Sequence, residues 1–159
     1  MSGGRQDKTP PVPRQAARAI LMDASGRVLL IHFAMPRGED VYTFWATPGG
    51  GMKPGESAMA AAKREVLEEL GVSPALHGPV HTAVGIFEYE GRMVENTDTF
   101  FLGRCDVMPA LRGATDNERA ALLALRWWTP EEIENTGEDV YPRDLAEVLG
   151  RLRRLFPGG

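Results

Sequence analysis

Residues Gly50 to Val72 constrain the fold of this chain more than any other stretch. Their sequence, GGMKPGESAMAAAKREVLEELGV, joins a glycine-rich segment to a stretch of helical periodicity that ends at a glycine. At about 100° per residue, four apolar side chains between residues 57 and 70 fall on one helix face. They are Met59, Ala62, Val66 and Leu70. The sequence therefore predicts a helix over residues 57–70 that packs one face against a core.

The same helix carries an unbalanced group of carboxylates. Glu65, Glu68 and Glu69 are spaced i, i+3 and i+4, so they share a face, with Glu69 at the edge of the apolar stripe. Like charges at this spacing repel, and the last turn is where the helix dipole disfavours anions. Arg64 can reach Glu68 but does not balance three carboxylates. A solvated acidic face would alternate with lysines, and none separates Glu65 from Glu69. We therefore favour a site for Mg²⁺ or Mn²⁺.

The glycine-rich segment before the helix, TPGGGMKPGE, supports the same interpretation. Glycines permit positive φ angles and a close approach of backbone amides or carbonyls to a metal or a phosphate. A GGG run is also common in flexible turns, so its position beside the acidic helix is what makes it informative. We expect Gly49, Gly50 and Gly51 to contact a substrate.

Apolar and β-branched runs predict strands on both sides of this stretch. The predicted strands cover residues 19–22, 28–33, 41–47, 80–88, 98–105 and 122–128. A helix that begins after Thr129 and an amphipathic helix over residues 144–156 complete the pattern. MPRGED at 35–40 and the segment 74–79 are expected as a loop and a connector. This set of elements predicts a mixed α/β (α+β) fold, with helices on the faces of a mixed β-sheet.

The first sixteen residues are expected to form a flexible tail. They are rich in glycine, proline and charge, and Pro10, Pro11 and Pro13 disfavour a helix or a central strand. Residues 17–156 would then form one domain, a length that can bury a full hydrophobic core.

Composition excludes several functional classes. The net charge of −4 argues against a nucleic-acid-binding protein, which needs a basic face. The single cysteine, Cys105, allows neither an intrachain disulfide nor a Cys-rich zinc site. The polar start lacks the apolar core of a signal peptide, and no run approaches the length of a membrane span. We expect a soluble cytoplasmic protein that binds neither nucleic acid nor membrane.

The central stretch also resembles a known family at every fixed position. Gly50, Glu56 and the run REVLEELGV at 64–72 match the Nudix box, G-x5-E-x7-R-E-U-x-E-E-x-G-U, in which U is aliphatic. The resemblance implies an α/β/α sandwich with a mixed sheet over most of the chain. It also implies hydrolysis of a nucleoside diphosphate linked to another moiety, with water cutting a P–O bond in the presence of a divalent metal.

Carried over by position, the resemblance implies metal ligands. Glu65, Glu68 and Glu69 would bind the metal with their carboxylates, and a backbone carbonyl of Gly50 or Gly49 would add a ligand. Glu65 is in addition the general-base candidate.

The resemblance implies supporting residues as well. Arg64 would orient the glutamates, and Glu56 would have a supporting rather than a catalytic role. Many members use a further acid outside the box. Glu118 is our choice for it, followed by Asp116 and Glu95.

The substrate stays open at this point. Tyr89 lies 17 residues after the box, near the position where dinucleoside polyphosphate hydrolases of the family carry a tyrosine. Nucleoside triphosphates, dinucleoside polyphosphates and nucleotide sugars all remain candidates. The alternative to an enzyme is a catalytically silent Nudix-fold sensor that binds nucleotides. Homodimers are common in the family, but nothing in the sequence specifies one.

Overall fold

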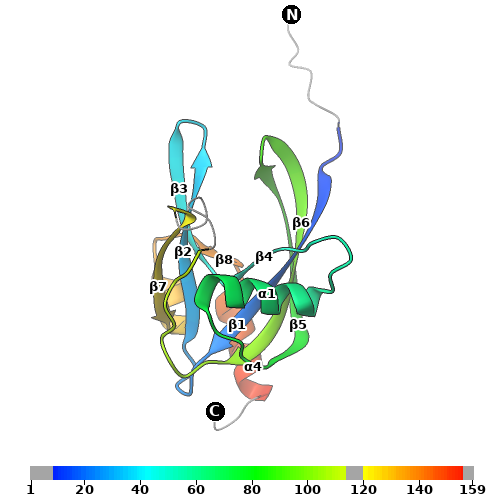
Figure 1. Cartoon of the computed structure of the whole chain (residues 1–159). Coiled ribbons are helices and arrows are strands. Elements are labelled where there is room, and N and C mark those ends of the chain that lie inside the picture. Colours follow the sequence, from blue (N-terminus) through cyan, green and yellow to red (C-terminus); the bar gives the residue numbers. More distant parts are fainter. Residues whose placement is uncertain (1–8, 114–119, 156–159) are drawn as a thin grey trace, which may run out of the picture.

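The computed structural model describes residues 9–113 and 120–155, which form a mixed β-sheet with helices packed on it (Figure 1). The described elements, in chain order, are β1 (Val12–Met22), β2 (Val28–Arg37), β3 (Asp40–Ala46), β4 (Gly49–Gly51), α1 (Ala58–Leu70), β5 (Leu76–Tyr89), β6 (Arg92–Arg104), β7 (Leu122–Trp128), α3 (Pro130–Asn135), β8 (Val140–Tyr141) and α4 (Leu145–Leu155). The strand order is β5-β6-β1-β2-β3-β8, with β4 paired to β1 and β7 paired to β2.

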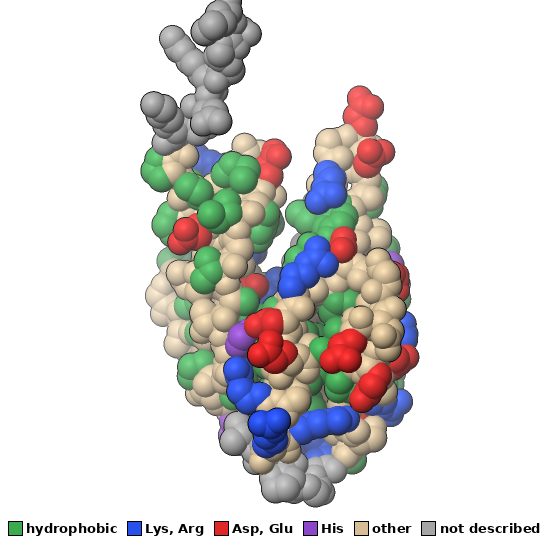
Figure 2. Space-filling view, turned by 180° about the vertical axis from the view of Figure 1, so that it is seen from behind, with side chains coloured by type: hydrophobic (Ala, Val, Ile, Leu, Met, Phe, Trp, Pro, Cys, Tyr) green, Lys and Arg blue, Asp and Glu red, His purple; other side chains and the backbone are tan. Residues whose placement is uncertain are grey.

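The sheet splays into two arms because its two central strands stay together only at one end. β1 and β2 pair at Met22 and Val28 and then diverge. The first arm contains β1, β4, β5 and β6, and β1 runs parallel to β6 along its whole length. The second arm contains β2, β3, β7 and β8. The two arms rise on either side of α1 (Figure 1), and a notch separates them at the surface (Figure 2).

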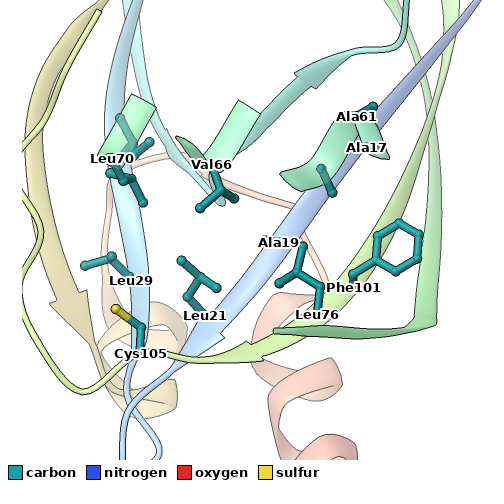
Figure 3. Packing of buried hydrophobic residues seen from close by; sticks show 12 residues of the cluster. Ala17, Ala19, Leu21, Leu29, Ala61, Val66, Leu70, Leu76, Phe101 and Cys105 are labelled. Atoms are coloured by element: carbon teal, nitrogen blue, oxygen red, sulfur yellow. The ribbon is translucent and has the colours of Figure 1, made fainter. Parts of the chain in front are cut away.

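The central strands are buried on both faces, and successive residues alternate between two cores. In β1, Ala17, Ala19 and Leu21 pack against α1 in one apolar cluster (Figure 3). Ile20 points the other way, into a cluster completed by α4. Helices therefore cover both faces of the sheet, which confirms the predicted α/β/α sandwich.

The predicted bounds of the helices agree with the structure because their end signals are strong. Ser57 caps α1 by accepting a hydrogen bond from the amide of Ala60 at 3.1 Å, and Gly71 ends it with a φ of 68°. Thr129 and Glu132 form a capping box at the start of α3.

The expected tail was too long. β1 begins at Val12, and Ala16 is fully buried, so residues 12–16 belong to the sheet. Pro13 is tolerated because β1 pairs only with β6 over residues 12–14, which leaves an open edge for a residue without an amide hydrogen. Residues 1–8 lie outside the described part of the chain.

Two segments expected as a loop and a connector belong largely to strands. Strand β2 continues to Arg37 and β3 starts at Asp40, so MPRGED is a tight hairpin turning at Gly38 with a φ of 62°. Strand β5 begins at Leu76, inside the expected connector. Cross-strand pairing extends both segments past the apolar runs from which the strands were predicted. No helix among the described residues is long and apolar enough to cross a bilayer.

Candidate active site

The glycine segment packs against the acidic face of α1. Its three glycines form the short strand β4, which pairs with Ala16, Ala17 and Arg18 of β1 and is therefore not a flexible loop. The backbone amide of Gly49 donates to Oε1 of Glu69 at 2.9 Å. At Gly50, a Cβ atom would lie 2.7 Å from the Glu65 carboxyl carbon. Only glycine lets the Glu65 carboxyl group approach the strand this closely.

Arg64 is the centre of the ion-pair network in this site. Its guanidinium donates to both oxygens of Glu56, at 2.7 and 2.9 Å. Nη1 donates to Glu65 at 2.9 Å and to Glu68 at 3.3 Å. Nη2 also donates to the carbonyl of Gly51 at 3.0 Å. One arginine thus connects the helix, the loop before it and strand β4, and its orienting role in catalysis stays a prediction.

Burial sets the electrostatics of the carboxylates. Burial, together with the negative charge of Glu65, raises the pKa of Glu69 to about 8. Burial also raises the pKa of Glu65, against the opposing effect of the Arg64 hydrogen bond. The Arg64 hydrogen bonds instead hold the pKa of Glu56 at about 2. Within residues 9–113 and 120–155, Glu69 accepts one hydrogen bond, from the amide of Gly49, and forms no ion pair.

Arg18 is a residue of the site that the sequence analysis did not identify. It donates through Nε to Asp98 at 3.0 Å and through Nη1 to the carbonyl of Thr47 at 2.9 Å. Its positive charge partly offsets the rise in the pKa of both Glu65 and Glu69. The signal was an arginine in the otherwise apolar run AARAIL, where an unpaired charge would be costly.

The structure describes only some of the site residues predicted outside the box. Glu118 and Asp116 lie outside the described residues, so the choice between them stays a prediction. Glu95 is exposed on β6, and in the part of the chain that the structure describes it has no hydrogen bond or ion pair to this site. Tyr89 ends β5 and lies under the guanidinium of Arg14, 4.4 Å from Cζ to the ring centroid.

The donor set suits a hard divalent cation, although it is not assembled around one. Among the described residues, no three acidic, histidine or cysteine side chains are arranged to hold a metal ion. The carboxylates of Glu65 and Glu68 accept hydrogen bonds from Arg64, and the carboxylate of Glu69 accepts one from the amide of Gly49. Three carboxylates beside a side-chain-free backbone nevertheless supply the oxygen ligands that such ions prefer, and the half-buried Glu69, which forms no ion pair among the described residues, would gain a counter-charge.

Comparisons with known proteins identify the family of this chain. A family model described as the NUDIX domain matches residues 12–149. An isopentenyl-diphosphate Delta-isomerase from Nocardia farcinica (strain IFM 10152) is 33% identical over 144 residues, covering 85% of this chain and 76% of that protein. A Bacillus subtilis (strain 168) protein, provisionally assigned as an 8-oxo-dGTP diphosphatase, is 31% identical over 119 residues, covering 75% of this chain and 68% of that protein.

Solved structures show the same fold. The crystal structure of a MutT protein from Methanosarcina mazei Go1 superposes with a TM-score of 0.69 at 19% sequence identity, covering 93% of this chain and 98% of that one. The chain belongs to the Nudix family. The resemblance seen in the box at 50–72 therefore extends to nearly the whole chain.

Proposed function

We propose that this Nudix protein is a divalent-metal-dependent pyrophosphohydrolase, with Mg²⁺ as the preferred ion. Its substrate would be a nucleoside diphosphate linked to another moiety, and water would cleave a P–O bond of the diphosphate. The observation that carries this proposal is the contact between β4 and α1, where Glu65 and Glu69 lie against the glycine backbone.

The metal would be held by the carboxylates of Glu65, Glu68 and Glu69 and by the backbone carbonyl of Gly50. When bound, a divalent ion neutralises diphosphate charge and lowers the pKa of a water molecule. Glu68 is more accessible than Glu65, since its side chain is 37% exposed against 17% for Glu65. It therefore has more freedom than Glu65 to turn from Arg64 towards a ligand.

Glu65 would accept the proton of the attacking water, and two neighbouring residues would hold Glu65 in position. Glu65 accepts the Arg64 hydrogen bond through Oε1, which leaves Oε2 for a proton from the attacking water. The raised pKa of Glu65 makes its carboxylate a stronger base than a solvated glutamate. Arg64 holds Glu65 in place, and Glu56 in turn holds Arg64.

The glycine strand would bind the substrate through its backbone. Gly50 and Gly51 are half-buried and have no side chains, so their backbone can approach a substrate, whereas Gly49 is buried. Tyr89 of the first arm would contact the part of the substrate beyond them. Glu118 remains our choice for an additional acid from outside the box.

A substrate panel tests the proposal. Hydrolysis is measured by chromatographic separation of substrate and products for a nucleoside triphosphate, a diadenosine polyphosphate and ADP-ribose, with Mg²⁺ and with EDTA. We expect Mg²⁺-dependent cleavage of at least one of them. Tight nucleotide binding without cleavage under any condition would instead indicate the silent sensor.

The Nocardia relative justifies one more compound in the panel. Isopentenyl diphosphate would undergo double-bond isomerisation without phosphate release if the chain shared the activity in that protein's name. Proton NMR detects this reaction directly. Isomerisation together with an inert nucleotide panel would replace the hydrolase proposal.

A further inference from the structure

The first arm carries an arginine, Arg14, that the proposed function does not use. Arg14 of β1 donates through Nη1 to Oδ1 of Asn96 at 2.6 Å. Its guanidinium lies over the ring of Tyr89, 4.4 Å from Cζ to the centroid. The three residues come from β1, β6 and β5, so the pairing of these strands brings them together. The hydrogen bond and the stacking fix the guanidinium in one plane.

This group borders the glycine strand. A Cβ atom on Gly51 would lie 3.2 Å from Nη2 of Arg14, so the guanidinium lies against the Gly51 backbone. The Gly51 carbonyl accepts a hydrogen bond from Arg64. A single residue of β4 therefore separates Arg14 from the network that holds the catalytic carboxylates.

The charge of Arg14 is not neutralised within the described chain. Arg18, on the same face of β1, is paired with the carboxylate of Asp98 at 3.0 Å. Arg14 instead bonds to the neutral amide of Asn96, and no carboxylate among residues 9–113 and 120–155 forms an ion pair with it. Asn96 is only 3% exposed, so this neutral partner is built into the sheet. Within the described part of the chain, one of the five guanidinium N–H donors of Arg14 is used, and the others have no hydrogen-bond acceptor there.

The second arm offers a useful contrast. Arg37 stacks on Tyr42 in a similar way, 4.1 Å from Cζ to the ring centroid. Asp139 accepts a hydrogen bond from Tyr42, and the charge of Arg37 lowers the pKa of Asp139. A carboxylate therefore lies near that arginine, whereas no carboxylate among the described residues forms an ion pair with Arg14.

We propose that Arg14, held by Asn96 and Tyr89, binds a phosphate group of the substrate that lies beyond the scissile diphosphate. A guanidinium with unused N–H donors can form two parallel hydrogen bonds with two oxygens of one phosphate group. The inference rests on the proposed function and narrows its substrate class. It favours nucleoside triphosphates and dinucleoside polyphosphates over nucleotide sugars, in which the group beyond the diphosphate is neutral.

Asn96→Asp is the most informative variant because it changes the charge beside Arg14 and little else. The aspartate keeps the size of the side chain and its hydrogen bond to Arg14 but neutralises the guanidinium. Arg14→Gln removes the cation itself. Arg92→Gln is the matched control, since Arg92 is an exposed arginine of the same arm. Thermal unfolding of each variant shows whether it folds.

The first measurement is the ratio of kcat/KM for a nucleoside triphosphate to kcat/KM for ADP-ribose. We expect Asn96→Asp and Arg14→Gln each to lower this ratio by roughly ten- to a hundredfold, the loss of one charge-assisted phosphate contact. Arg92→Gln should leave it unchanged. An unaltered ratio in both site variants would overturn the phosphate subsite and leave the hydrolase proposal standing.

The second measurement does not depend on catalysis. Binding of inorganic tripolyphosphate is followed by calorimetry in EDTA, with all four proteins. We expect the wild type and Arg92→Gln to bind equally, and the two site variants to bind at least about tenfold more weakly. The same result with an inactive nucleotide panel would support the subsite and reject the hydrolase. Equal affinity in all four proteins, or no binding by the wild type, would overturn the subsite.

Discussion

Arg64 donates to both carboxylate oxygens of Glu56, from Nε to Oε2 at 2.7 Å and from Nη2 to Oε1 at 2.9 Å. This two-point contact fixes the plane of the guanidinium, as a single contact could not. Nη1 then faces Glu65 and Glu68. Glu56 therefore acts on the carboxylate face of α1 through Arg64, without touching that face itself.

Glu56→Gln should lower kcat by roughly tenfold and spare the fold. The amide cannot accept from both guanidinium nitrogens, so Arg64 would hold Glu65 and Glu68 less well, a loss typical of residues that orient ligands. Steady-state kinetics at saturating Mg²⁺ measures the effect. Glu56→Asp, which keeps the charge, should recover part of the activity. Full activity in Glu56→Gln would mean that the Arg64 contact does not organise the site.

Glu68→Gln and Glu69→Gln should each reduce turnover by at least about a hundredfold under saturating Mg²⁺. Both replacements keep side-chain volume, and both remove a carboxylate that the proposed mechanism needs. Leu67→Gln is the control, because Leu67 directly precedes Glu68 on α1 but is 51% exposed and belongs to neither core cluster. Near wild-type turnover in both glutamine variants would contradict the assignment.

Helix α1 and its acidic face were predictable because the signals are local. Ser57, the 3.6-residue apolar period and Gly71 define the helix without reference to the rest of the chain. Apolar and β-branched runs likewise predicted most of the strands that fill both cores. The family resemblance then supplied the layers, which agree with the structure.

The contacts of Arg14 and Arg18 could not be predicted from the sequence. Their partners Asn96 and Asp98 are 82 and 80 residues away along the chain. Only the parallel register of β1 with β6 brings them together, and register depends on pairing across the whole sheet. Strand β4 was missed for a similar reason, since glycines have no strand preference and its pairing comes from β1.

The stability of the metal-free protein should fall as the pH rises from about 4.5 to about 8. The pKa of Glu69 is about 8 in the folded protein against a reference value of 4.5, so the folded state binds more protons within this window. Glu65, whose pKa is also raised, acts in the same direction. Thermal unfolding in EDTA at several pH values measures the trend.

Glu69→Gln is the control for this pH dependence and should flatten it. In the wild type, Mg²⁺ should raise Tm more at pH 8 than at pH 6, because protons compete with the ion for the same carboxylates. A pH profile in EDTA that is the same in wild type and Glu69→Gln would show that Glu69 does not titrate in this range.

Gly50→Ala should fold normally and lose most of its activity. The added Cβ would lie 2.7 Å from the Glu65 carboxyl carbon, and that flexible group can move away at little cost to the fold. The displaced carboxylate would then be out of position for catalysis, with a loss of about a hundredfold. Gly137→Ala is the control, because nothing lies within 4 Å of its Cβ position. Retained activity in Gly50→Ala would show that the Glu65 position seen here is not required.

The most direct test of the central claim is hydrolysis in ¹⁸O-labelled water, followed by ³¹P NMR on the wild type and Glu69→Gln. We predict that the wild type with Mg²⁺ places one ¹⁸O on a phosphorus of the cleaved diphosphate, and that EDTA or Glu69→Gln abolishes this labelling. Labelling that persists in Glu69→Gln, or its absence from every phosphorus in the wild type with Mg²⁺, would contradict the assignment of the acidic face of α1 as a hydrolytic metal site.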